Sequence, residues 1–232
     1  MPALEVHDLI KSYVSPDGET VPVIDVPRLT LDDAEQVVLH GGSGSGKTTL
    51  LNLIAGILPA DSGSVKLAGT EVSGLSESGR DRLRAERLGY VFQTFNLLQG
   101  YTALENVLLA MAFAGKVDDG AARALLKRMG LESRRDYRPS QLSVGQQQRV
   151  AVARALANKP SVVLADEPTG NLDPRSAVDA LALIRETCQE AGAALLLVSH
   201  DQQVLAQFDR SEELSELNRA VAVADASAGG AA

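Results

Sequence analysis

Cysteine and aromatic residues are scarce in this chain. It has one cysteine, Cys188, and no tryptophan. A single cysteine excludes an intramolecular disulfide and fits a reducing compartment. We expect Cys188, which falls in a helical pattern, to be a small core residue rather than a reactive thiol. Aromatic residues make up only 3% of the 232 residues, while hydrophobic residues as a whole reach 45%. Aliphatic side chains must therefore build the core, and the length predicts one α/β domain or one domain with an embedded subdomain.

An excess of positive charge and long apolar runs are also lacking. The formal net charge is -8. A protein that depends on phosphate contacts to DNA or RNA is usually basic, so nucleic acid is not expected as a partner. No stretch reaches the roughly 18 to 20 uninterrupted apolar residues of a membrane span, and the first residues do not resemble a signal peptide. We expect any membrane role to depend on a separate partner chain.

Strand patterns stand at both ends of the chain, and a helical region lies between them. Strands are predicted at residues 4–13, 36–40, 64–67, 90–92, 162–165 and 193–198, and helices at residues 47–58 and 177–190. Residues 21–31 are expected to form strand interrupted at Pro22 and Pro27, at a sheet edge. Residues 102–158 carry mainly helical signals. This order predicts an α/β core with a helical insertion.

A glycine-rich loop follows the predicted strand 36–40 and opens the predicted helix 47–58. Its sequence, GGSGSGKT, fits the pattern G-x-x-x-x-G-K-[ST]. Glycines let the backbone N–H groups turn toward phosphate oxygens, Lys47 can neutralise the β- and γ-phosphates, and the Thr48 hydroxyl can ligate Mg²⁺. The residues expected to hold the nucleotide are Gly41, Ser43, Gly44, Ser45, Gly46, Lys47, Thr48 and Thr49. The loop alone does not separate a kinase, a GTPase and an ATPase.

Two carboxylates end the apolar strand 162–165. Asp166 is then at the carboxyl edge of the sheet, near the phosphate loop, where it can support Mg²⁺. Glu167 follows directly and can act as the general base that deprotonates the attacking water. Without the phosphate loop, two surface acids at the end of a strand would be the better interpretation.

The segment from Leu142 to Gln146, LSVGQ, decides between the nucleotide-binding classes. It resembles the LSGGQ signature of the ATP-binding cassette (ABC) ATPases, and the resemblance extends over nearly the whole chain. It implies a P-loop NTPase (RecA-like) core at residues 1–93 and 159–220, with an N-terminal antiparallel β subdomain. It also implies an α-helical subdomain at residues 94–158 and a flexible tail at residues 221–232.

Further site residues follow from this resemblance. Tyr13 would stack on adenine, Gln93 would contact Mg²⁺ and sense a membrane partner, and His200 would contact the γ-phosphate. The signature residues Ser143, Gly145 and Gln146 would contact the ATP bound by a second subunit. ATP with Mg²⁺ is thus expected between the subunits of a head-to-tail homodimer, crossed by the loop at residues 171–173. The catalytic set would be Lys47, Glu167 and His200, and the metal set Thr48, Gln93 and Asp166.

The segments QTFNLL at residues 93–98 and ADEPTGNLD at residues 165–173 resemble one bacterial subgroup. It contains the lipoprotein-release, macrolide-export and cell-division ATPases. The resemblance implies an ATPase in the cytoplasm, held peripherally on the inner face of the cell membrane by a separate integral-membrane permease. The alternative is the ATPase of a non-transporting cell-division or mechanotransmission complex with an FtsX-like permease. Transported substrate and direction stay open.

Two segments depart from the family pattern. Val144 replaces the first glycine of the signature, where a branched side chain restricts the backbone and could crowd the facing nucleotide. We expect binding to survive because Ser143 and Gly145 are retained. Residues 211–217 replace an apolar closing strand by a polar sequence, for which a helix is predicted.

Overall fold

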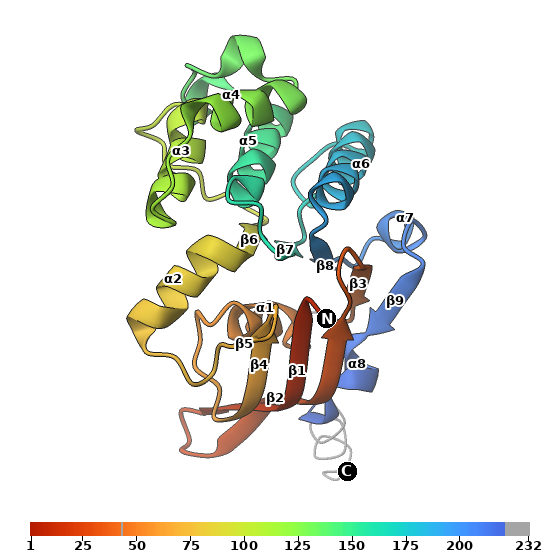
Figure 1. Ribbon diagram of the computed structural model, residues 1–232. Coiled ribbons are helices and arrows are strands. Elements are labelled where there is room, and N and C mark those ends of the chain that lie inside the picture. Colours follow the sequence, from red (N-terminus) through yellow and green to blue (C-terminus); the bar gives the residue numbers. More distant parts are fainter. Residues whose placement is uncertain (43, 221–232) are drawn as a thin grey trace.

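Two β-sheets and a layer of helices make up the computed structural model of this chain, which describes residues 1–42 and 44–220 (Figure 1). The core sheet has five parallel strands in the order β6-β7-β8-β3-β9. They are β6 (Leu88–Val91), β7 (Val162–Asp166), β8 (Ala194–Val198), β3 (Gln36–His40) and β9 (Arg210–Glu213). The predicted strands at residues 36–40, 90–92, 162–165 and 193–198 all lie here, with bounds that differ by at most two residues.

The second sheet is antiparallel and has the strand order β2-β1-β4-β5. It consists of β1 (Leu4–Val14), β2 (Thr20–Leu31), β4 (Ser62–Leu67) and β5 (Thr70–Glu71). The prediction that the two prolines mark an edge strand is confirmed, but the predicted interruption is wrong. Strand β2 is continuous through Pro22 and Pro27, with a one-residue irregularity at Val23 in its pairing with β1, because an edge strand needs hydrogen bonds to a neighbouring strand on one side only.

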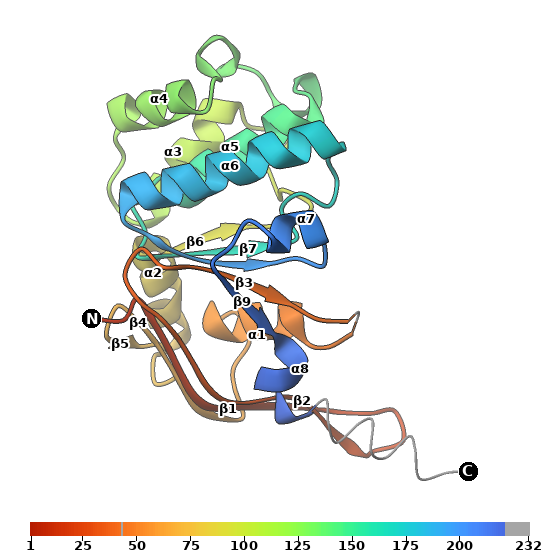
Figure 2. The same ribbon diagram turned by 90° about the vertical axis from the view of Figure 1, so that its right-hand side faces the viewer.

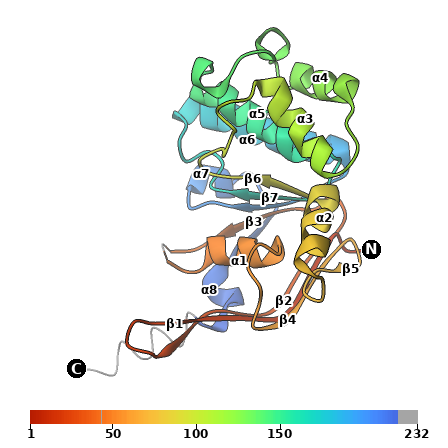
Figure 3. The same cartoon turned by 90° about the vertical axis from the view of Figure 1, so that its left-hand side faces the viewer.

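The helices are distributed over both faces of the core sheet (Figures 2 and 3). One face is covered by α3 (Ala103–Phe113), α4 (Asp119–Arg128), α5 (Val144–Leu156) and α6 (Pro174–Ala191), and the other by α1 (Lys47–Ile54). Helix α2 (Glu77–Arg87) packs beside β6, and two short helices, α7 (Gln202–Leu205) and α8 (Leu214–Leu217), flank β9. None of the helices within residues 1–42 and 44–220 has the length and apolarity that a membrane crossing requires.

The core sheet separates two hydrophobic cores. Alternate residues of β7 point to opposite faces, as strand geometry requires: Val163 and Ala165 join the core under the helical layer, whereas Val162 and Leu164 join the core shared with α1 and the antiparallel sheet. Cys188 is fully buried in the helical-layer core, and burial raises the pKa of its thiol to about 12. Its predicted role as a core residue is confirmed.

Two predicted helices are corrected by the structure. Helix α1 ends at Ile54 rather than at residue 58, because Ala55 caps it and Gly56 follows in the left-handed region with φ 63°. Residues 211–217 are helical only from Leu214. The preceding stretch forms β9, which pairs in parallel with β3 and provides hydrogen-bond partners for the backbone groups on the outer side of that strand. The predicted frayed tail at residues 221–232 lies outside the described residues.

Candidate active site

The phosphate loop leaves β3 at the carboxyl edge of the core sheet and enters α1 through Gly46. This glycine has φ 95°, and α1 has no side-chain cap at its N-terminus. A Cβ at Gly46 would lie 2.9 Å from Ile24 Cδ1 and 3.1 Å from the carbonyl oxygen of Val23. Only glycine fits this conformation and this close approach of two backbones. No side chain therefore caps the first backbone N–H groups of the helix, and these groups can bind an anion.

Lys47 lies over the loop that it ends. Its ammonium donates hydrogen bonds to the carbonyl oxygens of Gly41 at 2.8 Å and Gly42 at 2.6 Å, and it lies 3.4 Å from Ser45 Oγ. The charge is thus held inside the loop that was predicted to bind phosphates. Ser43, which was also predicted to contact the nucleotide, lies outside the described residues.

Thr48 and Asp166 meet although 118 positions separate them. The Thr48 hydroxyl donates to Asp166 Oδ2 at 2.9 Å. Burial raises the pKa of the Asp166 carboxyl above its usual range, and the neighbouring charge of Glu167 acts in the same direction, against the Thr48 hydrogen bond. A hydroxyl beside a desolvated carboxylate is a pair of oxygen ligands suited to Mg²⁺. Two protein oxygens are too few for a complete octahedral shell, so this pair fits a metal that arrives with phosphate.

Glu167 and His200 form the second pair at this sheet edge. Glu167 Oε1 lies 2.6 Å from His200 Nδ1, and this hydrogen bond raises the pKa of the His200 imidazole. Glu167 has φ 45°, a conformation that non-glycine residues rarely adopt. Its N–H donates to the carbonyl oxygen of Val198 at the end of β8, at 3.0 Å. The backbone is therefore held in a strained conformation that aims the carboxylate at His200.

Gln93 is held close to this edge by contacts of its neighbours. Asn171 Nδ2 donates to the Gln93 carbonyl oxygen at 2.7 Å. Two and three residues further on, Phe95 and Asn96 have φ 61° and 49°. Their carbonyl oxygens accept hydrogen bonds from the Arg154 guanidinium of α5, at 2.7 and 2.5 Å.

The role of Arg154 was not predicted from the sequence. An arginine within the apolar run AVARALA was the signal that could have marked a partly buried cation with a fixed partner.

Tyr13 lies near the end of β1, opposite Val21 of β2. Two residues along β2, the Val23 carbonyl approaches Gly46 of the phosphate loop. The register therefore brings the Tyr13 end of β1 to the side of the loop. The Tyr13 residue is 43% exposed, and Lys11 Nζ lies 5.7 Å from the ring centroid. An aromatic ring with an accessible face beside a phosphate loop suits stacking on a base.

The signature residues stand apart from this group, in the helical layer. Ser143 is the N-cap of α5, and it forms a capping box with Gln146: Gln146 N–H donates to Ser143 Oγ at 3.3 Å, and Ser143 N–H donates to Gln146 Oε1 at 3.0 Å. Because α5 and α1 cover opposite faces of the core sheet, one chain does not bring its signature to its own phosphate loop (Figure 2). Val144 is 47% exposed.

Comparison with known proteins agrees with this geometry. The family profile described as "ABC transporter" matches residues 24–170.

The chain belongs to the ABC transporter family.

Its relatives include the lipoprotein-releasing system ATP-binding protein LolD of Alcanivorax borkumensis, 43% identical over 218 residues that cover 93% of this chain and 95% of the relative. LolD of Pseudomonas fluorescens is 45% identical over 217 residues, covering 92% and 95%. Among solved structures, the dimeric post-hydrolysis state of the ATP-binding cassette MJ0796 with ADP and Pi aligns with a TM-score of 0.82 at 33% identity, covering 94% of this chain and 95% of that one.

The predicted P-loop NTPase fold of the ABC type is confirmed. The chain is an ABC ATPase, the ATP-binding subunit of a membrane ABC transporter, and the relatives do not favour the cell-division alternative.

Proposed function

We propose that this ATPase drives a lipoprotein-releasing system and works as a head-to-tail homodimer. A separate integral-membrane permease would hold it on the cytoplasmic face of the inner membrane. The names of the LolD relatives and the dimeric state of the solved cassettes support this proposal. One observation supports the catalytic part of this proposal: two hydrogen-bonded pairs lie at one edge of the core sheet, beside Lys47. The pairs are Thr48 with Asp166 and Glu167 with His200.

ATP binding would use the phosphate loop and the antiparallel sheet together. Lys47 would exchange the loop carbonyls for the β- and γ-phosphates, which compensate its charge better than neutral oxygens do. Adenine would stack on the Tyr13 ring. Thr48 and Asp166 would hold Mg²⁺ with support from Gln93. The metal would neutralise charge on the phosphates, which is the usual contribution of a cation in phosphoryl transfer.

Hydrolysis would depend on separating Glu167 from His200. The Glu167 oxygen that faces His200 at 2.6 Å is engaged in a hydrogen bond and is a poor acceptor for a further proton. When His200 turns to the γ-phosphate, this oxygen becomes available to a water molecule. Glu167 then takes the proton of that water, and His200 stabilises charge on the phosphate.

The second subunit would complete each site through its signature. The Ser143 hydroxyl accepts the Gln146 N–H but retains its own proton, which it can donate to a γ-phosphate oxygen. The first N–H groups of α5 and the positive end of its dipole lie beside it. A twofold axis would then place two ATP molecules between two phosphate loops and two signatures.

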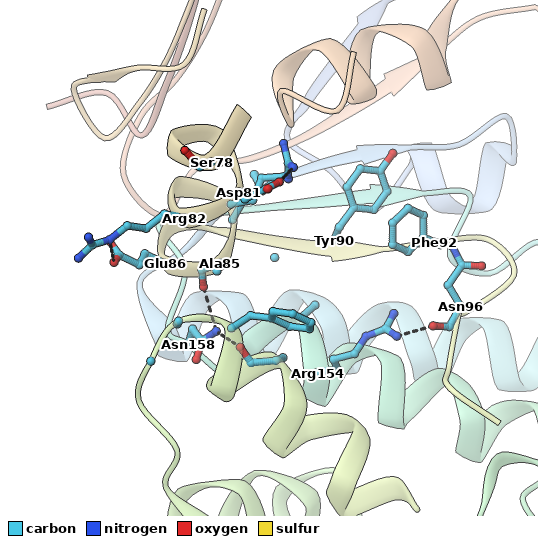
Figure 4. Close-up of a pocket in the computed structure, with 18 residues that line it drawn as sticks. Ser78, Asp81, Arg82, Ala85, Glu86, Tyr90, Phe92, Asn96, Arg154 and Asn158 are labelled. Atoms are coloured by element: carbon cyan, nitrogen blue, oxygen red, sulfur yellow. Dashed lines mark hydrogen bonds and ion pairs between the residues drawn. The ribbon is translucent and has the colours of Figure 1, made fainter. Parts of the chain in front are cut away.

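A groove beside α2 is the surface that we assign to the permease (Figure 4). It has a volume of about 900 Å³ and lies between α2, β6 and the ends of α3 and α5. Tyr90 and Phe92 stack in it at 4.0 Å, and Phe113 at its rim is 73% exposed. Arg154, which holds the loop after Gln93, also lines the groove. A partner seated here would touch the support of Gln93, so its displacement would reach the active site.

Two variants separate binding from hydrolysis. Glu167→Gln keeps the side-chain shape but cannot take a proton. We expect it to bind ATP and to lower hydrolysis by roughly a hundredfold or more. Lys47→Ala removes the phosphate-binding ammonium and is expected to abolish ATP binding. The measurements are titration with a fluorescent ATP analogue and single-turnover release of phosphate. Unchanged single-turnover hydrolysis in Glu167→Gln would refute the assignment of the base, and unchanged affinity in Lys47→Ala that of the phosphate loop.

The permease surface is tested by adding a charge to it. Phe113→Asp should prevent co-purification of a multi-spanning membrane chain from native membranes, while ATP binding by the isolated subunit stays unchanged. Ile57→Asp is the matched control, because Ile57 is 46% exposed and does not line the groove. Equal recovery of the membrane chain with both variants would show that the permease docks elsewhere.

A further inference from the structure

Asn218 follows α8 and is fully buried, although it is a polar residue near the end of the described chain. Its Oδ1 accepts the N–H of Asp25 at 2.7 Å and that of Ala220 at 3.2 Å. Its Nδ2 donates to the carbonyl oxygens of Val23 at 2.8 Å and Ser45 at 3.4 Å. One side-chain amide thus joins strand β2 to the phosphate loop.

The bonds to β2 replace those of a missing neighbouring strand. Strand β2 is at the edge of its sheet, so one row of its backbone groups faces away from β1. The β1–β2 register also shifts here: Lys11 pairs with Ile24, but Ser12 pairs with Pro22, which leaves Val23 as the extra residue. Asn218 satisfies the carbonyl of Val23 and the N–H of Asp25, on either side of Ile24, and so holds the irregular part of the strand in place.

The same segment supports both ends of the phosphate loop. At its start, Leu214 of α8 is fully buried, and its Cβ lies 3.4 Å from the position that a Cβ would take at Gly41. At its end, Asn218 contacts Ser45, and the Val23 carbonyl approaches Gly46. Strand β9 leads into this support by pairing with β3, the strand that enters the loop.

We propose that Asn218 is a positioning residue for nucleotide binding. It fixes the phosphate loop to the part of β2 that lies two residues from Val21, the partner of Tyr13, and so sets the distance between the phosphates and the adenine platform. The inference rests on the proposed binding mode of ATP. Asn218 does not contact Glu167 or His200, which follow β7 and β8, so its loss should weaken binding and leave the chemical step unchanged.

The test compares Asn218→Ala with Asn106→Ala in the full-length protein. Asn106 is a suitable control because it is also buried, at 1% exposure, and its side chain also bonds backbone groups, but in the helical layer. Both variants should lower the melting temperature. Only Asn218→Ala should weaken the affinity for MgATP, by about fivefold, which corresponds to the loss of roughly one hydrogen bond. Its single-turnover rate at saturating ATP should stay within about twofold of wild type.

Wild-type affinity in Asn218→Ala would overturn the positioning role, whereas a wild-type protein that does not bind ATP would overturn the proposed function instead. Asn218→Asp keeps the shape and the acceptor but loses both donated bonds, and should weaken binding at least as much as Asn218→Ala.

If the variants do not fold, hydrogen exchange measured on the unmodified chain replaces them. MgATP should slow exchange at residues 214–220 as well as in the phosphate loop, and unchanged exchange at 214–220 contradicts the proposal.

Discussion

Two loops of this chain each lead into a helix, and they form the helix N-terminus in different ways. The phosphate loop enters α1 through a left-handed glycine and leaves the first N–H groups without side-chain caps. The signature enters α5 through Ser143, whose side chain and that of Gln146 cap the helix reciprocally. The first loop is shaped by backbone conformation and by contact with β2. The second is held by the reciprocal cap between its own side chains, Ser143 and Gln146.

This difference indicates how the two loops would be used. The phosphate loop would bind phosphate with a cation of its own chain, because Lys47 already lies inside the loop. The signature is stable when exposed, which suits a surface that meets ligand only when a second subunit arrives. Val144 lies at the first position of α5 and is partly exposed, so the helix itself does not need glycine there.

The largest effect is expected from blocking the signature. In a Glu167→Gln background, which should retain ATP, we expect the otherwise unmodified chain and Val144→Gly to dimerise with ATP in size-exclusion chromatography. Ser143→Arg should stay monomeric, because its bulk fills the anion site and removes the cap. If only Val144→Gly dimerises, the signature of this chain is degenerate, and its difference from the phosphate loop does not reflect use by a second subunit.

The same substitution in both loops sharpens the comparison. Gly46→Ala forces a Cβ into left-handed backbone and against β2, and should cost about 1–3 kcal/mol of unfolding free energy. Gly145→Ala adds a Cβ that meets nothing within 4 Å, in helical backbone, and should change stability by less than about 1 kcal/mol. Urea unfolding of both variants provides the measurement. Equal losses would mean that the phosphate loop is not constrained by its contact with β2.

The smallest effect concerns pH. The hydrogen bond to Glu167 raises the pKa of His200, so the stability from this pair is complete below the ordinary imidazole pKa of about 6.5 and is lost as the pH rises through the raised value. The His200 side chain is 75% exposed, which limits the contribution to less than about 1 kcal/mol. Melting curves of wild type and His200→Gln should therefore converge as the pH rises. A difference that grows with pH would contradict this assignment.

The sequence predicted the parts that follow from strong local patterns. Asp166 and Glu167 end an apolar strand, and parallel strands bring their carboxyl ends to one edge, so their meeting with Thr48 and His200 was foreseeable. The contacts of Asn218 were not, because they depend on a β9 strand that the polar sequence RSEE did not suggest.

Helix α2 was missed for a similar reason. Leu83 is its only buried residue, so its sequence, ESGRDRLRAER, carries little apolar periodicity. Ser76 accepts a hydrogen bond from Gly79 N–H at its start, and this cap was the available signal.

Helix α5 is one rigid element that joins two distant sites, the signature and the loop after Gln93. It begins at the signature and, two residues before its end, presents Arg154 to the loop that follows Gln93. Thirteen residues make a rod about 20 Å long. A rotation of about 10° around its middle would move each end by nearly 2 Å, in opposite directions. A permease that tilts this rod from the groove would thereby shift the Ser143 hydroxyl relative to the other subunit's phosphate, so that α5 acts as a lever.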